Sequence, residues 1–94
     1  MRIVDIIWIP YIVDKLFSKH QVKPEEVIEV LFDNPMYRKV QRGHIPGEDV
    51  YMAMGCTDAG RYLIIFFIYK PTQEALILSA RDMDRKERRQ YGRR

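Results

Sequence analysis

The sequence predicts an α+β fold in which two N-terminal helices and a C-terminal helix pack on an antiparallel meander sheet, in the order βααββββα. Three observations lead to this prediction: two amphipathic segments that each open on a proline, a series of Ile-, Phe- and Tyr-rich runs separated by turn residues, and a charged segment after the last run. At 94 residues, the chain is expected to form one domain over residues 1–94, with a basic helix and tail over 82–94.

The N-terminal third is predicted to form one strand and two helices. Residues 2–8 are rich in Ile and Val and precede Pro10, which is well placed in the first turn of a helix that continues to His20. The second helix is expected to begin at Pro24, with two glutamates in its first turn, and to end before Pro35. Because both helices are amphipathic, both are expected to cover one face of the sheet.

The remaining strands are predicted at residues 36–41, 50–57, 61–69 and 75–80, and the strand at 36–41 has the weakest pattern. Residues 62–69 are apolar at almost every position, which indicates a central strand that is covered on both faces. The core is expected to include Trp8, Phe66 and Phe67. The helix over 82–91 has few apolar residues, so it is expected to leave part of the second face for a partner.

Composition excludes several classes of protein. The single Cys56 excludes an internal disulfide and a multi-cysteine zinc site and favours a reducing, cytoplasmic environment. No apolar run approaches the roughly 20 residues that span a bilayer, so no membrane partner is expected. Residues 1–80 hold nine basic and ten acidic side chains, whereas residues 81–94 hold seven and three. This basic end is either a solvated tail or a binding surface for nucleic acid or an acidic protein.

The sequence contains no glycine-rich phosphate loop, no Gly-x-Ser-x-Gly elbow and no paired His or Cys spacing for a metal, so no cofactor is expected. A reaction would therefore depend on protonatable side chains and on cations. Metal-independent RNA cleavage fits that description, because the 2′-hydroxyl of the substrate is the nucleophile and the protein supplies a base, cations for the phosphate and an acid for the leaving oxygen.

Arginines are the candidate cations. Arg81, Arg85, Arg88 and Arg89 have the spacing of one helix face, and Arg61 opens a strand that a meander can place next to Arg81. Two guanidinium groups at neighbouring strand ends would form a pocket for the scissile phosphate. The alternative for the helical arginines is a solvated surface with ordinary charge pairs.

The candidates for proton exchange are Glu48, in the loop before a strand, and the pair Lys19 and His20 at the end of the first helix. Tyr91 is a candidate for stacking on a base. Each also has a structural interpretation: a solvated carboxylate for Glu48, a helix terminus for His20 and a docked aromatic ring for Tyr91.

Several short motifs resemble the BrnT family of toxins over nearly the whole chain from Trp8. They are Lys19-His20-Gln21-Val22, Glu25-Glu26-Val27, Leu31-Phe32-Asp33, Gly47-Glu48, Gly60-Arg61, Ile77-Leu78-Ser79-Ala80-Arg81, Glu87-Arg88 and Tyr91. The resemblance implies a RelE-like ribonuclease fold, a type II toxin–antitoxin role, RNA cleavage that arrests translation, and a DNA-binding antitoxin of the BrnA kind encoded by an adjacent gene. It points to Lys19 or His20, Glu48, Arg61 and Arg81 as site residues, with Glu87, Arg88 and Tyr91 as secondary ones.

The chain departs from the family on its first helix. Where the family usually has Asp, Lys and Asn, this sequence has Ile9, Ile12 and Leu16, and Gln21 replaces a glycine. The apolar face implies a different partner, a homodimer contact through an apolar helix or sheet face, or reduced activity. It therefore favours a second hypothesis, a non-catalytic module that binds nucleic acid or an acidic protein.

Overall fold

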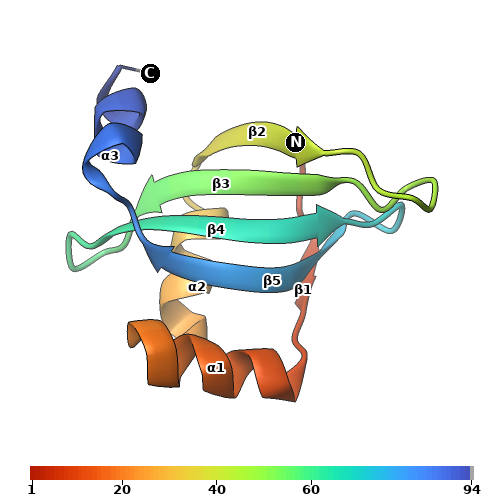
Figure 1. The fold of residues 1–94 in the computed structure, drawn as a ribbon, viewed down its shortest axis with the longest axis horizontal. Helices are drawn as coiled ribbons and strands as arrows, with labels where there is room; N and C mark the ends of the chain where they lie inside the picture. The colour runs from red at the N-terminus through yellow and green to blue at the C-terminus, as the bar shows by residue number, and fades with distance from the viewer. Residues whose placement is uncertain (94) are drawn as a thin grey trace.

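The computed structural model describes residues 1–93, and its elements follow the predicted order βααββββα (Figure 1). Arg94, the last residue of the predicted basic tail, lies outside the described residues. No helix among the described residues is long and apolar enough to cross a bilayer. The elements are β1 (Asp5–Ile7), α1 (Pro10–His20), α2 (Pro24–Leu31), β2 (Met36–Gln41), β3 (Val50–Cys56), β4 (Tyr62–Tyr69), β5 (Glu74–Asp82) and α3 (Arg85–Gly92).

The strands form one five-stranded sheet in the order β1-β5-β4-β3-β2. Strands β2 to β5 form the predicted antiparallel meander, and β4 is the central strand, as expected. The sheet as a whole is mixed, because β1 pairs in parallel with β5 from Asp5 opposite Glu74 to Ile7 opposite Leu76. Only these three residues of the predicted strand over 2–8 are in the sheet.

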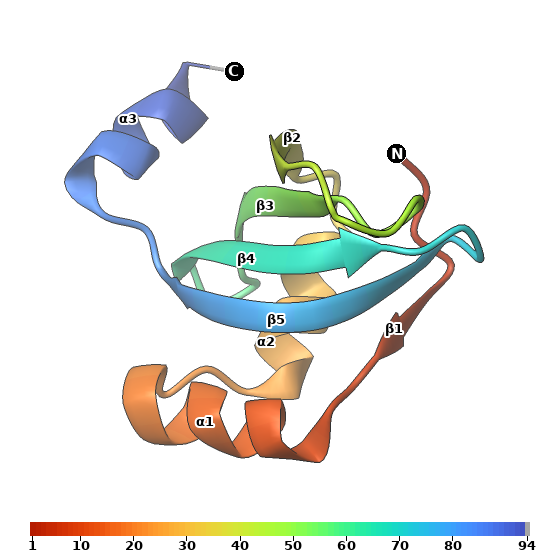
Figure 2. The ribbon, with the colours of Figure 1, turned by 45° about the vertical axis from the view of Figure 1, so that its right-hand side comes forward.

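The two early helices cover one face of the sheet, which we call the α1–α2 face (Figure 2). Phe67 is fully buried there, Trp8 packs at its edge, and Leu16 of α1 is only 4% exposed. Ile12 also packs against this core, whereas Ile9 stays 38% exposed. Two of the three apolar residues by which α1 departs from the family therefore belong to the core.

The opposite face, which we call the α3 face, is covered only at one end. There Met52, Met54 and Ile64 form a small core with Met83, and the Tyr91 ring packs against it. No residue of α3 itself is buried. As expected from its few apolar residues, α3 covers only part of this face. It lies over the end of the sheet that holds the β3–β4 turn, and the rest of the face has no helix over it (Figures 1 and 2).

The junction of β5 and α3 differs from the prediction. Strand β5 continues to Asp82, because Arg81 and Asp82 still pair with β4, and α3 begins only at Arg85. The Asp84 carboxylate sets this start, since it accepts the backbone N–H of Glu87 at 2.7 Å as a helix N-cap. Arg81 is therefore a strand residue, and the prediction that it shares a helix face with Arg85, Arg88 and Arg89 is wrong.

Candidate functional site

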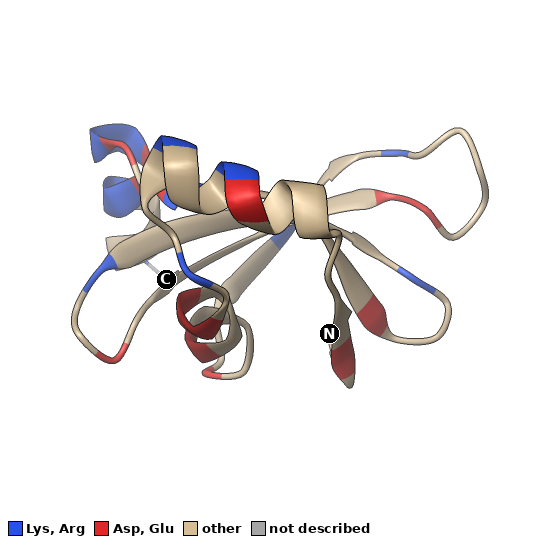
Figure 3. Ribbon diagram, turned by 90° about the horizontal axis from the view of Figure 1, so that it is seen from below, with Lys and Arg blue, Asp and Glu red and all other residues tan. Residues whose placement is uncertain are grey.

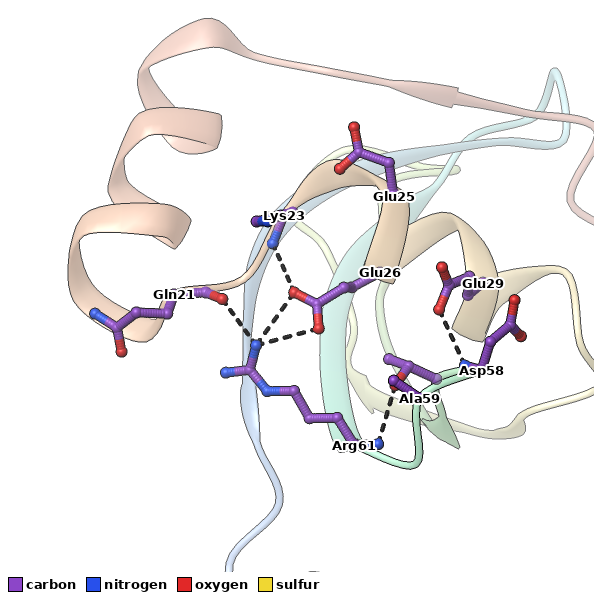
Figure 4. A pocket seen from close by; sticks show the side chains of 9 residues that line it. Gln21, Lys23, Glu25, Glu26, Glu29, Asp58, Ala59 and Arg61 are labelled. Carbon is purple, nitrogen blue, oxygen red and sulfur yellow. Dashed lines mark hydrogen bonds and ion pairs between the residues drawn. The ribbon is translucent and has the colours of Figure 1, made fainter.

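Arg61 connects four segments of the chain on the α1–α2 face. Its Nε donates to Asp82 Oδ1 at 2.7 Å, and its Nη2 donates to Asp82 Oδ2 at 3.2 Å and to the His20 carbonyl at 2.6 Å. Its Nη1 donates to the Gln21 carbonyl at 2.8 Å and to Glu26 Oε1 at 3.1 Å (Figure 4). All five N–H bonds of the guanidinium group have acceptors.

These contacts give Arg61 a structural role. It fixes the link between α1 and α2 to the ends of β4 and β5, and its N–H groups are already used. The hydrogen bond from Arg61 also lowers the pKa of Asp82, against the opposing effect of burial. A phosphate oxygen would have to displace one of these carboxylates or carbonyls.

The cavity beside Arg61 is also unfavourable for RNA. It has a volume of about 660 Å³ and is lined by acidic side chains, among them Glu25, Glu26, Glu29 and Asp58 (Figure 4). In the view from below the sheet, the acidic residues of α2 lie close to the acidic position in the β3–β4 turn (Figure 3). Carboxylates at this density repel the phosphate backbone of a nucleic acid.

Arg81 lies on the α3 face. Its Nη1 and Nη2 donate to Glu87 Oε1 and Oε2 at 2.8 and 2.9 Å, and Nη1 also donates to the Asp82 carbonyl at 3.1 Å. The guanidinium carbon is 5.8 Å from the centre of the Phe66 ring. The ion pair with Arg81 lowers the pKa of Glu87, whose carboxylate also accepts the Asp84 backbone N–H.

The expected pocket shared by Arg61 and Arg81 is not formed. Both residues lie at the same end of the sheet, but their guanidinium groups are on opposite faces. The cause is a β-bulge in β5: Phe66 pairs with Ser79 and Phe67 with Ile77, so one extra residue lies between them. The bulge reverses the alternation of side chains along the strand and turns Arg81 away from the two early helices.

A groove of about 340 Å³ lies next to Arg81 on the α3 face. Met52, Ile64 and Phe66 form its apolar floor, and β2 and α3 form its walls. The wall residues include Arg38 and Val40 of β2 and Glu87 and Gln90 of α3. Phe66 was assigned to the core, but it is only half-buried here and links the groove to Arg81.

The helix α3, which supplies one wall of this groove, carries most of the basic residues at the C-terminal end of the chain (Figure 3). Arg85 and Arg89 are exposed, and the Arg88 guanidinium carbon lies 4.3 Å from the centre of the Tyr62 ring. Tyr91 makes an edge contact with the same ring, at 6.0 Å between centroids. The interpretation of Tyr91 as a docked aromatic ring is therefore supported, and Arg88 is partly fixed by cation–π contact.

The three candidates for proton exchange are not close to Arg81. Glu48 forms an ion pair with Lys70 at 2.7 Å, at the end of β4 opposite to Arg61, roughly 30 Å away along the strand. The partner of Glu48 is thus a lysine of the β4–β5 turn region, and the loop that carries Glu48 folds against that turn. Lys19 and His20 end α1 on the other face, and Lys19 is exposed.

Two residues of the Arg61 cluster were missed from the sequence as partners of that arginine. The sequence pattern marks Glu26 as a carboxylate favoured by the helix dipole and Asp82 as a member of an ordinary charge pair at the start of the last helix. The sequence signal for Glu26 is its position three residues after Lys23, the N-cap of α2. From there the Glu26 carboxylate accepts the Lys23 backbone N–H at 3.0 Å. That arrangement holds its carboxylate next to Arg61.

Comparison with known proteins identifies a family. The family model described as the ribonuclease toxin BrnT of type II toxin–antitoxin systems matches residues 13–87, which include both arginine clusters. No curated protein matches the sequence.

Proposed function

Because the chain belongs to the BrnT family of ribonuclease toxins of type II toxin–antitoxin systems, we propose that it cleaves RNA on the α3 face of its sheet, with Arg81 bound to the scissile phosphate and without a metal ion. A type II toxin has an RNA substrate and a cognate antitoxin. Arg61, Lys19, His20 and Glu48 lie elsewhere and are not part of this centre.

One observation carries the choice of Arg81. The guanidinium group of Arg81 donates three hydrogen bonds, two to the Glu87 carboxylate and one to the Asp82 carbonyl. Its Nε–H and one Nη2–H have no acceptor among residues 1–93. It is also 35% exposed in its side chain. Arg81 is therefore positioned by Glu87 and still able to bind phosphate oxygens, whereas every N–H of Arg61 is used.

Glu87 is the carboxylate that lines the groove next to this phosphate site. Its Oε1 accepts two hydrogen bonds and its Oε2 accepts one, so Oε2 has a lone pair for the 2′-hydroxyl proton. The 2′-oxygen then attacks phosphorus, Arg81 stabilises the charge on the non-bridging oxygens, and the bond to the 5′-oxygen breaks. The proton on Glu87 returns through solvent to that oxygen, giving a 2′,3′-cyclic phosphate and a 5′-hydroxyl end.

The basic residues of α3 are proposed to hold the RNA backbone. Arg85 and Arg89 are exposed and project from the same helix that carries Glu87. Arg88 and Tyr91 form one cluster with Tyr62, which offers an aromatic surface at the rim. Contacts of this kind attach a protein to phosphates without regard to sequence.

The test is cleavage of labelled RNA in EDTA by Arg81→Ala, with growth arrest on expression as the cellular readout. We expect cleavage to fall about 100-fold or more, because a donor to the charged transition state is lost. The wild-type products are expected to end in a 2′,3′-cyclic phosphate. Thermal melts of the variant verify that the fold persists without the pair to Glu87.

Arg42→Ala is the matched control, since it removes an exposed arginine from the loop at the other end of the sheet. It should leave cleavage and growth arrest unchanged. Full toxicity of a folded Arg81→Ala variant would exclude the assigned role. Cleavage that stops in EDTA and returns with a divalent cation would exclude the metal-independent mechanism.

For the partner, we propose a DNA-binding antitoxin of the BrnA kind, encoded by an adjacent gene and acting in the cytoplasm. Sequencing the neighbouring reading frame tests this directly. The non-catalytic interaction module loses its main support, because Ile12 and Leu16 pack into the core instead of forming an exposed apolar face.

A further inference from the structure

We propose that the groove beside Arg81 is a specificity site for a purine base, the base of the nucleoside whose phosphate Arg81 binds. This inference rests on the proposed function and adds to it the kind of nucleotide at which the RNA is cut. It is carried by the shape of the groove, by one amide side chain and by the surrounding charge.

The floor of the groove suits the flat face of a base. Met52, Ile64 and the ring of Phe66 present apolar surface from two neighbouring strands, and the groove has a volume of about 340 Å³. Unstacked bases in protein sites rest on aromatic and apolar side chains, and the strength of stacking favours purines. Because the Phe66 ring also contacts Arg81, a base on this floor lies next to the phosphate site.

The walls supply polar groups for the edge of the base. The Gln90 side chain lines the groove, and its amide has no hydrogen-bond partner among the described residues. Glutamine amides bind adenine in a bidentate manner, with one donor and one acceptor. Gln90 is the wall residue that offers both a donor and an acceptor to the edge of a base, whereas the Glu87 carboxylate is held by Arg81 and the Asp84 backbone N–H.

Charge favours RNA as the occupant of this groove. Arg38 on the β2 wall is exposed and has no ion-pair partner among residues 1–93, and the Arg81 guanidinium group lies over the Phe66 ring of the floor. The comparable cavity on the α1–α2 face is lined by carboxylates. A polyanion with an exposed base therefore fits the α3 face and not the opposite one.

The experiment compares binding of short 2′-O-methyl oligonucleotides, which cannot be cleaved: a uridine hexamer, and the same hexamer with one internal adenosine or one internal guanosine. Fluorescence anisotropy should show the adenosine oligonucleotide binding about tenfold more tightly than the uridine hexamer. Because the Gln90 amide matches the edge of adenine, the wild type should also bind the adenosine oligonucleotide more tightly than the guanosine one, and Gln90→Ala should remove that preference. Phe66→Leu, which keeps an apolar floor without the ring, should reduce the preference for purines over uridine.

Gln41→Ala and Phe32→Leu are matched controls, because both replace exposed residues outside the groove. They should leave all three affinities unchanged. Equal affinities of the wild type for the three oligonucleotides, or preferences that persist in Gln90→Ala and in folded Phe66→Leu, would overturn the purine site. Cleavage of unmodified RNA is measured with the same preparations. If the wild type cleaves RNA but shows no base preference, only the purine site is wrong; if the wild type does not cleave RNA, the proposed function itself is wrong.

Discussion

Hydrogen-bond saturation separates two arginines that look equivalent in the sequence. Arg61 donates all five of its N–H bonds within the protein, to two carboxylates and two carbonyl groups. Arg81 keeps two N–H bonds for a ligand and is held in place by a bidentate carboxylate. At the scale of single residues, one arginine therefore stabilises the fold and the other is available for chemistry.

Arg61→Ala is expected to lower the free energy of unfolding by about 2 to 3 kcal/mol, because it leaves two carbonyls without their donor and removes the cation paired with the half-buried Glu26 carboxylate. Chemical denaturation measures this loss. Arg61→Lys should recover part of it, since an ammonium group keeps the charge but cannot reach all four partners.

Lys70→Ala is the comparison for this prediction. It removes a single pair to Glu48, and the loss should be below about 1 kcal/mol. Equal stability losses in Arg61→Ala and Lys70→Ala would contradict the structural role of Arg61.

The sequence singled out Arg61 and Arg81 as candidates, but it could not show on which face of the sheet each one lies. Regular alternation along β5 would place Arg81 on the same face as Ala75 and Ile77, where Arg61 is. The bulge around Leu78 reverses that parity, so Ile77 and Ala80 both face the early helices and Arg81 faces α3. No local pattern marks the position of the bulge, because residues 75–78 are apolar at every position and do not show which side chains face the early helices.

At the scale of elements, α3 is attached to the sheet by few contacts. They are the apolar contact of Met83 and Tyr91, the stacking around Tyr62 and the pair between Arg81 and Glu87. The existence of this helix was predictable from its charge pattern. The residue at which α3 begins was not predictable. Residues 81–82 pair with β4 instead of joining the helix, and that pairing depends on a neighbouring strand, so the helix begins only after the cap at Asp84.

This attachment should depend on pH. The pKa of Glu87 is lowered in the folded protein. The pair with Arg81 therefore stabilises the attachment of α3 fully at pH values above the ordinary pKa of a carboxyl group, and this stabilisation is lost as the pH falls through the lowered pKa. Hydrogen exchange of α3 amides, corrected for intrinsic rates, should therefore show constant protection from pH 8 to 5. Protection should decline below roughly pH 4.

Glu87→Gln provides the control, since it removes the titrating group and leaves a side chain of the same shape. Its α3 amides should be less protected at neutral pH and should lose the acid dependence. Acid-induced loosening of α3 that is the same in Glu87→Gln and in the wild type would assign the effect to other carboxyl groups.

At the scale of the whole molecule, charge is divided between the two faces of the sheet. Acidic residues gather at α2 and the β3–β4 turn, and basic residues gather on α3 (Figure 3). The net charge of +3 hides this division. The sequence indicated the basic segment correctly, whereas the acidic cavity arises from residues of α2 and a distant turn that come together only in the fold.

RNA binding should therefore depend on salt through basic residues of the α3 face, including those of α3 itself. In a plot of log affinity against log salt concentration, Arg89→Ala should reduce the slope by about 0.7, the value for one contact to a single strand. Lys15→Ala, at an exposed position on α1, should leave the slope unchanged. Equal effects of the two substitutions would show that RNA is not confined to the α3 face.

The parallel pairing of β1 with β5 has a consequence for biosynthesis. Residues 5–7 are translated some seventy residues before their partners at residues 74–76. Strand β1 therefore stays unpaired while the intervening chain is translated, because its pairing with β5 is a long-range contact that needs residues 74–76. A nascent copy is thus unable to complete its sheet until translation has passed residue 76.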